Sequence, residues 1–184
     1  DVSESRGLGD VYKRQAVSSP DYPPDFFTGL ITESDWDDIS TNPDKPLINR
    51  YIQGKYIPGS IVKMITQIAL LKSQHFNKEL KQYCPGFYQF GDRIFGCWYT
   101  EGHGELNVTE AMAVSCDVYF YKTVKQLSLK DLNKTFNDFG FGQKTKIDIP
   151  NETVGLVPDS DYMRKRYGKY GWSKGVLLLS LIHI

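Results

Sequence analysis

Apolar residues recur at helical spacing in the stretch that follows Pro58 and Gly59. Residues three and four apart share one face of an α-helix, so this dense pattern predicts a buried helix over about residues 60 to 74. Pro58 and Gly59 break regular structure ahead of it, and Ser60 stands at the junction, where serine is a favoured N-cap. The apolar positions are Ile61, Val62, Met64, Ile65, Ile68, Ala69, Leu70 and Leu71.

Capping pairs predict further helices on both sides of this one. A capping residue followed three positions later by an acidic residue is typical of a helix start. Such pairs occur at Thr32 and Asp35, at Asn107 and Glu110, and at Ser128 and Asp131. We therefore predict helices over residues 32 to 40, from 107, from 117 to about 127, from 128 to Gly140, and from Trp172 onward.

Two segments carry weaker signals for strands. Residues 77 to 104 show little periodicity and are rich in aromatic, Gly and Cys residues, which predicts an irregular excursion with a short hairpin. Residues 146 to 150 alternate like a short strand, and Pro150 would end it.

Composition sets the class of the protein. The chain has 184 residues, 40% of them hydrophobic, and a formal net charge of zero. This length is sufficient for one domain with a real core. The neutral balance argues against a nucleic-acid partner, since phosphate binding needs an excess of Lys and Arg. No window reaches the roughly 18 apolar residues of a membrane span.

Both ends differ from the rest of the chain. Residues 1 to 15 lack clear periodicity, and positions 6 to 15 resemble a translated sequencing-adapter run found in metagenomic sequences. Residues 180 to 184 resemble another such read-through. We therefore expect residues 16 to 179 to be the natural sequence, an internal part of a longer protein. The alternative is a genuine flexible terminus.

Ser60 and Lys63 form a candidate reactive pair. One helical turn separates them, so the hydroxyl and the amine face the same way. A lysine in a buried helix start is costly unless it has partners, and a neutral amine beside a hydroxyl can take its proton. The alternative is a capping serine and a lysine that extends to solvent.

The three cysteines and one histidine form a candidate metal site. Cys84, Cys97, His103 and Cys116 follow the pattern Cys-x12-Cys-x5-His-x12-Cys. Tetrahedral zinc readily takes three thiolates and one imidazole, although these spacings are wider than those of zinc fingers. A disulfide with one free thiol, or three buried cysteines, would also fit. The odd count disfavours full disulfide pairing.

The residues around Ser60 resemble a known family. Asn49-Arg50, Gln53-Gly54 and Tyr56-Ile57-Pro58-Gly59-Ser60 are similar to the run that leads into the nucleophile of penicillin-binding proteins. Ser-x-x-Lys is a motif of that superfamily. Ser115-Cys116-Asp117 resembles the family's second motif, Ser-x-Asn or Ser-x-Asp, on a loop between two helices. The aspartate is similar to the elongation-type penicillin-binding protein 2.

The family's third motif, Lys-Thr-Gly, does not occur in this sequence. Lys144-Thr145-Lys146 lacks the glycine and follows Phe139-Gly140-Phe141-Gly142, which resembles a structural turn of the family. The segment from Trp172 to Gly175 is similar to the one that precedes the third motif by some distance. We therefore expect this chain to hold an incomplete active site and to be inactive by itself.

The resemblance implies an α+β fold, the β-lactamase/transpeptidase-like fold, of which this chain holds mostly the helical part and an incomplete sheet. It also implies a D,D-transpeptidase of cell-wall synthesis and cell-shape maintenance that is inhibited by penicillin. Ser60 would attack the D-alanyl-D-alanine carbonyl of a peptidoglycan stem peptide, with Lys63 as base. Ser115 would relay a proton, and Asp117 would bond the lysine or the substrate.

The resemblance further implies cofactors, partners and location. Some members of the penicillin-binding protein 2 group hold zinc at places that match Cys84, Cys97, His103 and Cys116, so zinc is a candidate structural ion. The expected partners are stem peptides, β-lactams, a RodA-type glycosyltransferase and other elongation-complex proteins, at the periplasmic face of the inner membrane, through an N-terminal anchor outside this sequence. A serine β-lactamase or β-lactam sensor is one alternative, and a non-catalytic zinc-stapled interaction module is another.

Overall fold

The computed structural model describes residues 17–183, which divide into two compact units. One consists of the chain up to Lys55 together with Lys146–Thr153, and the other of Tyr56–Thr145 and the chain from Val154 onward. Helices and two small antiparallel sheets make the fold α+β, as predicted. The run predicted to be non-native at 1 to 15 lies outside the described residues.

The first unit contains helix α1 (Glu33–Ser40) and the short helix α2 (Arg50–Gln53). Thr32 and Asp35 form the predicted capping box at the start of α1. Near α2, the Ser18 hydroxyl donates to the Ile48 carbonyl at 3.2 Å and accepts from the Arg50 amide at 2.8 Å. These bonds fasten the start of the described chain to α2.

The strand predicted over residues 146 to 150 is wrong. Lys146 has a φ of 64°, which lies in the left-handed region and interrupts an extended run. Within residues 17–183, these positions have no partner strand in either sheet. A strand needs a neighbour to satisfy its backbone groups, and the alternation here was too short to signal one.

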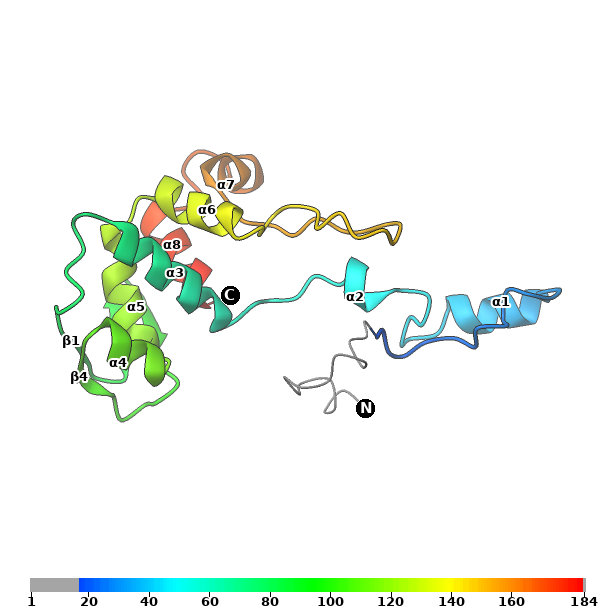
Figure 1. Ribbon diagram of the computed structural model, residues 1–184, viewed down its shortest axis with the longest axis horizontal. Coiled ribbons are helices and arrows are strands. Elements are labelled where there is room, and N and C mark those ends of the chain that lie inside the picture. The colour runs from blue at the N-terminus through cyan, green and yellow to red at the C-terminus, as the bar shows by residue number, and fades with distance from the viewer. Residues whose placement is uncertain (1–16, 184) are drawn as a thin grey trace. The chain divides into compact units, whose positions relative to one another are not determined.

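The second unit is mostly helical (Figure 1). Five of its helices match predicted ones, whereas α7 was not predicted because its residues lack an apolar face. Helix α8 continues through position 180, and the predicted natural boundary at 179 stays a prediction. The elements are α3 (Ile61–Lys72), α4 (Val108–Ala113), α5 (Asp117–Thr123), the 3-10 helix η2 (Val124–Gln126), α6 (Leu129–Asp138), α7 (Ser160–Tyr167) and α8 (Lys174–His183).

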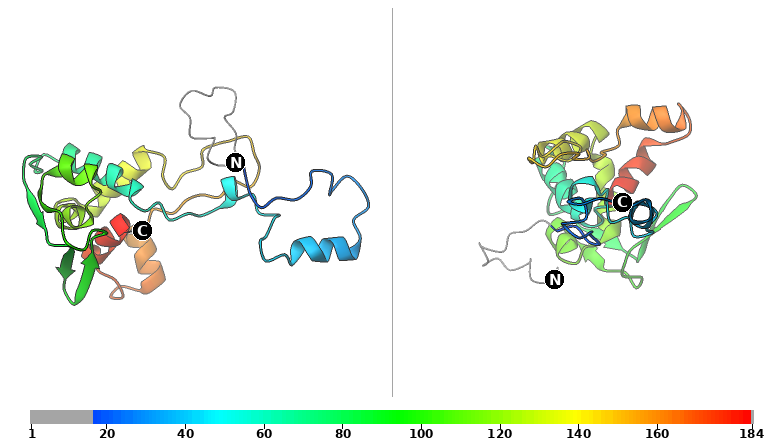
Figure 2. Two further views of the ribbon diagram at one scale, coloured as in Figure 1. Left: turned by 90° about the horizontal axis from the view of Figure 1, so that it is seen from below. Right: turned by 90° about the vertical axis from the view of Figure 1, so that its right-hand side faces the viewer.

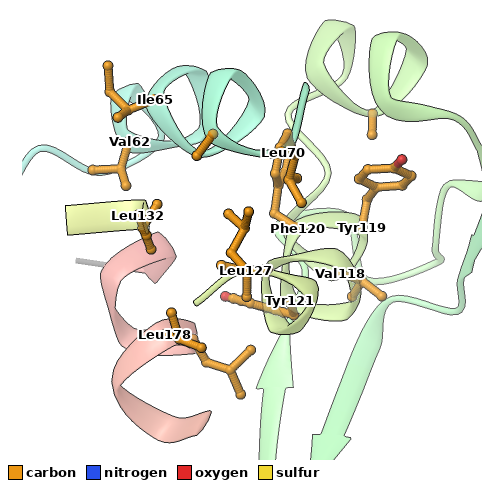
Figure 3. Close-up of a cluster of buried hydrophobic side chains, with 14 of the residues drawn as sticks. Val62, Ile65, Leu70, Val118, Tyr119, Phe120, Tyr121, Leu127, Leu132 and Leu178 are labelled. Carbon is orange, nitrogen blue, oxygen red and sulfur yellow. The ribbon is translucent and has the colours of Figure 1, made fainter. Parts of the chain in front are cut away.

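Helix α5 is the centre of the core (Figure 3). Its run of four apolar residues, Val118 to Tyr121, is buried completely or almost so. A helix that is apolar on every side must be covered on every side. Side chains from α3, α6 and α8 gather around this core, among them Leu70, Leu132 and Leu178. Burial raises the pKa of Tyr119 to about 12.

The segment between α3 and α4 forms the predicted hairpin and a second strand pair. Strand β2 (Phe87–Phe90) pairs with β3 (Arg93–Gly96) across a turn at Gly91, and Figure 2 shows this hairpin at the edge of the helical body. Strand β1 (Gln82–Cys84) pairs with β4 (Gly104–Leu106), with Cys84 opposite Gly104. This register brings the two ends of the excursion side by side.

Two glycines allow the excursion to fold onto itself. Gly86 and Gly102 both have a positive φ, and each lies against the backbone of the other's segment. A Cβ atom on Gly102 would lie 2.4 Å from the Cys84 carbonyl oxygen. A Cβ atom on Gly86 would lie 2.0 Å from the Thr100 carbonyl oxygen. Only glycine permits this approach. It places the residue after Gly102, His103, next to Cys84.

We expect Gly102→Ala to destabilise the protein more than Gly91→Ala. Both positions have a positive φ, so an alanine carries about 1–2 kcal/mol of backbone strain at either one. At Gly91 nothing lies within 4 Å of a new Cβ, whereas at Gly102 backbone atoms must move. The additional loss for Gly102→Ala should be about 1–3 kcal/mol in urea unfolding. Equal losses would contradict the close approach.

Candidate functional site

Ser60 lies at the N-terminal end of α3 with its hydroxyl turned away from the helix. It occupies the predicted N-cap position, but its side chain makes no capping bond, because its backbone is helical (φ −62°, ψ −11°) rather than extended. The Ser115 hydroxyl instead donates to the Ser60 hydroxyl at 3.2 Å. The Ser60 side chain is therefore exposed at the surface and linked to a residue 55 positions away.

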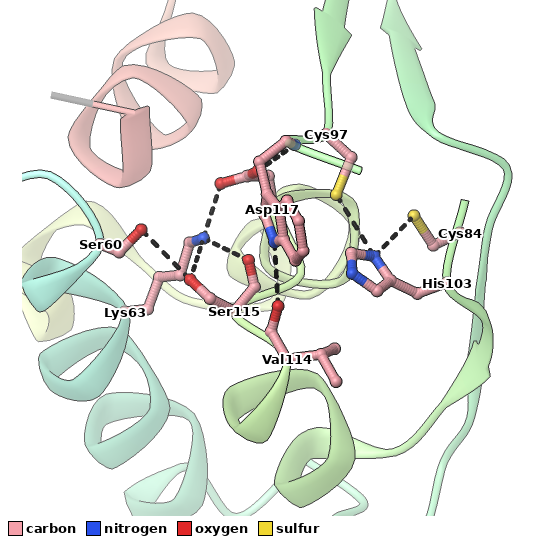
Figure 4. Close-up of polar contacts among 9 residues, drawn as sticks. Ser60, Lys63, Cys84, Cys97, His103, Val114, Ser115 and Asp117 are labelled. Atoms are coloured by element: carbon pink, nitrogen blue, oxygen red, sulfur yellow. Dashed lines mark hydrogen bonds and ion pairs between the residues drawn. The ribbon is translucent and has the colours of Figure 1, made fainter. Parts of the chain in front are cut away.

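Lys63 is buried beneath this pair of serines. Its side chain is 1% exposed, and its ammonium has three partners (Figure 4). The Nζ atom donates to the Ser115 carbonyl at 2.7 Å and to the Ser115 hydroxyl at 3.0 Å. It also lies 2.6 Å from Asp117 Oδ1. An ammonium has three hydrogen atoms to donate, so this site matches its capacity.

Ser115 adopts an unusual backbone conformation in the loop between α4 and α5. Its φ is 51°, in the left-handed region that non-glycine residues seldom adopt. The loop closes tightly, with the Cys116 amide donating to the Ala111 carbonyl at 2.8 Å. In this conformation both the carbonyl and the hydroxyl of Ser115 accept from Lys63. The strained turn thus places two acceptors on one ammonium.

Asp117 begins helix α5 and connects the lysine to the hairpin. A carboxylate in the first turn is favoured by the helix dipole. Its Oδ1 atom pairs with Lys63, and its Oδ2 accepts from the backbone amide of Trp98 at 2.9 Å. All four residues predicted for the reactive site, Ser60, Lys63, Ser115 and Asp117, therefore lie together.

Trp98 is a contact of this site that the sequence did not reveal. Besides its backbone bond to Asp117, its indole Nε1–H donates to the Val114 carbonyl at 2.9 Å. It thereby contacts the loop on both sides of Ser115. The one sequence signal was its position directly after Cys97, which by itself indicates no role.

The four predicted metal ligands also converge. The Sγ atoms of Cys84, Cys97 and Cys116 and a ring nitrogen of His103 all lie within 4.8 Å of one another. His103 Nδ1 is 3.7 Å from Cys84 Sγ and 3.5 Å from Cys97 Sγ. With zinc bonds of about 2.3 Å to sulfur and about 2.05 Å to nitrogen, a tetrahedron has a sulfur–nitrogen edge of about 3.6 Å. The donor set therefore fits zinc in type, and these two sulfur–nitrogen distances fit its tetrahedral spacing.

The thiols of this cluster differ in their affinity for protons. Burial by itself raises the pKa of the Cys84 thiol. Hydrogen bonds from the backbone at His103 and Gly86, and further hydrogen bonds with the two neighbouring thiols, outweigh this effect and bring the pKa of Cys84 below its ordinary value. Burial raises the pKa of Cys116, and the charge of Cys84 raises it further. Zinc binds thiolates, so occupation would release protons, and the Cys116 proton would be harder to remove than that of Cys84.

The disulfide alternative is not what the structure contains. All three cysteines are free and buried. The rings of Trp98 and Tyr99 lie 5.3 Å and 5.2 Å from that of His103, centre to centre. His103 Nε2 is buried without a hydrogen-bond partner among the described residues.

Comparisons with known proteins show the family to which this chain belongs. The family described as the penicillin-binding protein transpeptidase domain covers residues 14–184. The peptidoglycan D,D-transpeptidase MrdA of Acinetobacter baumannii is 38% identical over 162 residues, which are 86% of this chain and 24% of that protein. The penicillin-binding protein PBP2 of Helicobacter pylori superposes with a TM-score of 0.83 at 36% identity, covering 91% of this chain and 32% of that one.

A second structure of the Helicobacter pylori protein, in complex with MreC, gives a TM-score of 0.84 at 36% identity, over 91% of this chain and 31% of that one. The chain therefore belongs to the penicillin-binding protein transpeptidase family, and it resembles the PBP2 group. It spans about a quarter (24%) of the length of its Acinetobacter relative. No helix within the described part of the chain is both long and apolar enough to cross a membrane.

We expect the cluster to bind one zinc ion, and Cys116→Ser to lower both the zinc content and the melting temperature. A serine hydroxyl is a poor replacement for a thiolate, and a structural zinc site contributes directly to folding. Elemental analysis and differential scanning calorimetry measure the two quantities.

The control for this experiment compares substitutions at two histidines, His103 in the cluster and His75 outside it. His103→Asn should also lose zinc, whereas His75→Asn, at an exposed position away from the cluster, should keep it. Full zinc content in Cys116→Ser would remove that residue from the ligand set.

Proposed function

We propose that this chain is part of a peptidoglycan D,D-transpeptidase that cross-links stem peptides through a serine acyl-enzyme. The observation that carries this proposal is the continuous series of polar contacts from Ser60 through Ser115 to Lys63 and Asp117. An exposed hydroxyl linked to a buried amine is the arrangement that nucleophilic catalysis needs. The Acinetobacter baumannii relative is a peptidoglycan D,D-transpeptidase by name, which supports the same reaction.

In the acylation step, the Ser60 oxygen would attack the carbonyl of the penultimate D-alanine. Its proton would pass to the Ser115 hydroxyl while the Ser115 proton passes to Lys63, which must be the neutral amine at that moment. The peptide bond to the terminal D-alanine then breaks, and the leaving amine takes a proton back along the same route. The product is an ester on Ser60.

In the second step, an amine of a neighbouring stem peptide would attack this ester. A new amide forms, and Ser60 recovers its proton. The backbone N–H of Ser60 is one candidate donor to the oxyanion of both steps. A β-lactam would acylate Ser60 in the same way, since its strained amide imitates the acyl donor.

The Cys3His cluster would support this site without taking part in the chemistry. Cys116 lies between Ser115 and Asp117 in the sequence, and Cys97 directly precedes Trp98. A zinc ion with four protein ligands has no open position for substrate, so it would act by folding the loop. Cys84, Cys97, His103 and Cys116 would hold it.

Partners and location follow from the substrate. Peptidoglycan lies outside the inner membrane, so we infer that this domain works at its periplasmic face, held by a membrane anchor elsewhere in the full protein. The Helicobacter pylori relative was solved with MreC. We propose MreC, a RodA-type glycosyltransferase and other elongation proteins as partners of the full protein.

The reactive site of this chain would be incomplete. The family's Lys-Thr-Gly motif does not occur in the sequence. In the family, the strand that carries this motif supplies the other oxyanion donor. We therefore propose that full activity needs a longer protein.

Penicillin should acylate Ser60 in the complete transpeptidase domain. Intact-mass spectrometry should show one penicilloyl adduct on the wild type and on Ser73→Ala, and none on Ser60→Ala. An adduct that persists in Ser60→Ala would refute the assignment of the nucleophile. Rapid turnover of penicillin by the wild type would favour a β-lactamase instead.

Residues 16 to 179 alone should react with penicillin far more slowly than the complete domain. Removal of one oxyanion donor typically costs about 10²–10³ in rate, and this segment also lacks part of the surrounding sheet. Stopped-flow measurement of acylation compares the two proteins. A full rate in the short protein would overturn the proposal that its site is incomplete.

A further inference from the structure

Trp98 makes two hydrogen bonds to a single loop, one on each side of Ser115. Its backbone N–H donates to Asp117 Oδ2, and its indole N–H donates to the Val114 carbonyl, both at 2.9 Å. Figure 4 shows Val114, Ser115 and Asp117 in succession beside Lys63. The bonds and the intervening chain close a ring, and Ser115 lies within it.

The bond to Val114 acts on the peptide group that precedes Ser115. The φ angle of Ser115 is the rotation that sets this peptide plane against the rest of the residue. At 51°, that angle is intrinsically disfavoured for a serine, so the loop would relax to negative φ unless something held it. A relaxed loop would turn the Ser115 carbonyl or hydroxyl away from Lys63, to which both are now bonded.

The position of Trp98 is in turn set by the cysteine cluster. Trp98 directly follows Cys97, and its ring meets the His103 ring edge-on at 5.3 Å. The Cys97 amide donates to the Gly86 carbonyl at 2.8 Å, which holds this corner against the hairpin. The backbone of Trp98 is therefore held next to the cysteine cluster. Its backbone N–H and its indole N–H reach the loop between α4 and α5 that contains Ser115.

We propose that Trp98 is a positioning residue, which holds Ser115 and Asp117 in register with Lys63 and Ser60. The inference rests on the proposed acyl-transfer function, for which it supplies the link between the cluster and the reactive groups. Trp98 need not contact the substrate. Its indole N–H maintains the proton route, and its backbone N–H orients the carboxylate that pairs with the lysine.

The test is Trp98→Phe in the complete transpeptidase domain, with Trp36→Phe in α1 as the matched control. Phenylalanine keeps an aromatic ring but loses the indole donor. The first-order rate constant of acylation by penicillin should fall about three- to tenfold, the equivalent of one neutral hydrogen bond. The dissociation constant of the non-covalent complex, the number of titratable sites and the zinc content should match wild type. Trp36→Phe should change none of them.

A second variant guards against a mutant that fails to fold. Replacement of Trp98 by 3-benzothienylalanine keeps the size and shape of the ring and substitutes sulfur for the N–H group. It should reproduce the slower acylation. A wild-type rate in this variant, or a loss confined to zinc content or to the number of active sites, would overturn the positioning role.

The outcome also separates this inference from the proposed function. If the wild-type domain forms no adduct on Ser60, the proposed function fails and the role of Trp98 fails with it. If the wild type is acylated normally and both Trp98 variants match it, only the inference about Trp98 is refuted.

Discussion

The buried ammonium of Lys63 is the constraint on which the reactive site depends. A charged group with 1% of its side chain exposed must be paired and hydrogen-bonded, and it is stabilised here by Asp117 and by two oxygens of Ser115. Loss of one partner from a buried ion pair typically destabilises a protein by about 3–5 kcal/mol. The α4–α5 loop cannot move freely without leaving this charge unsatisfied, so the lysine determines where both motifs lie.

The need to pair the buried Lys63 ammonium explains why the strained backbone of Ser115 and the close backbone contacts of Gly86 and Gly102 lie near the same loop. Ser115 takes a left-handed conformation that presents two acceptors to Lys63 at once. Gly86 and Gly102 permit the backbone contact that brings His103 to the cysteines. Strained backbone persists where the surrounding structure over-determines it, as the cluster, the hairpin and the lysine do together here. The candidate metal ligands and the candidate reactive groups thus belong to one piece of folded chain rather than to two separate sites.

The Ser60 hydroxyl and the cysteine cluster differ in their exposure to solvent. Ser60 is exposed at the end of α3, as the proposed role of nucleophile requires. The three sulfurs are buried, which suits a closed structural site and protects the thiols from oxidation. Lys63 lies between these extremes, since it is buried yet joined to the exposed serine through the Ser115 hydroxyl. The fold therefore keeps the three sulfurs inside and the Ser60 side chain at the surface.

Local chemistry in the sequence determined the elements, whereas tertiary contacts decided the site. Capping pairs such as Thr32 with Asp35 and Asn107 with Glu110 predicted helix starts, because such bonds form within one turn. The Ser-x-x-Lys and Ser-x-Asp motifs predicted the candidate reactive residues by resemblance, and the cysteine and histidine types predicted the candidate ligands, and each set lies together in the structure. The strand predicted at residues 146 to 150 failed, because a strand depends on a partner that local alternation cannot supply. Trp98 was also invisible, because its role comes from two bonds to residues 16 and 19 positions away. Contacts of that range are created by packing, and no local pattern encodes them.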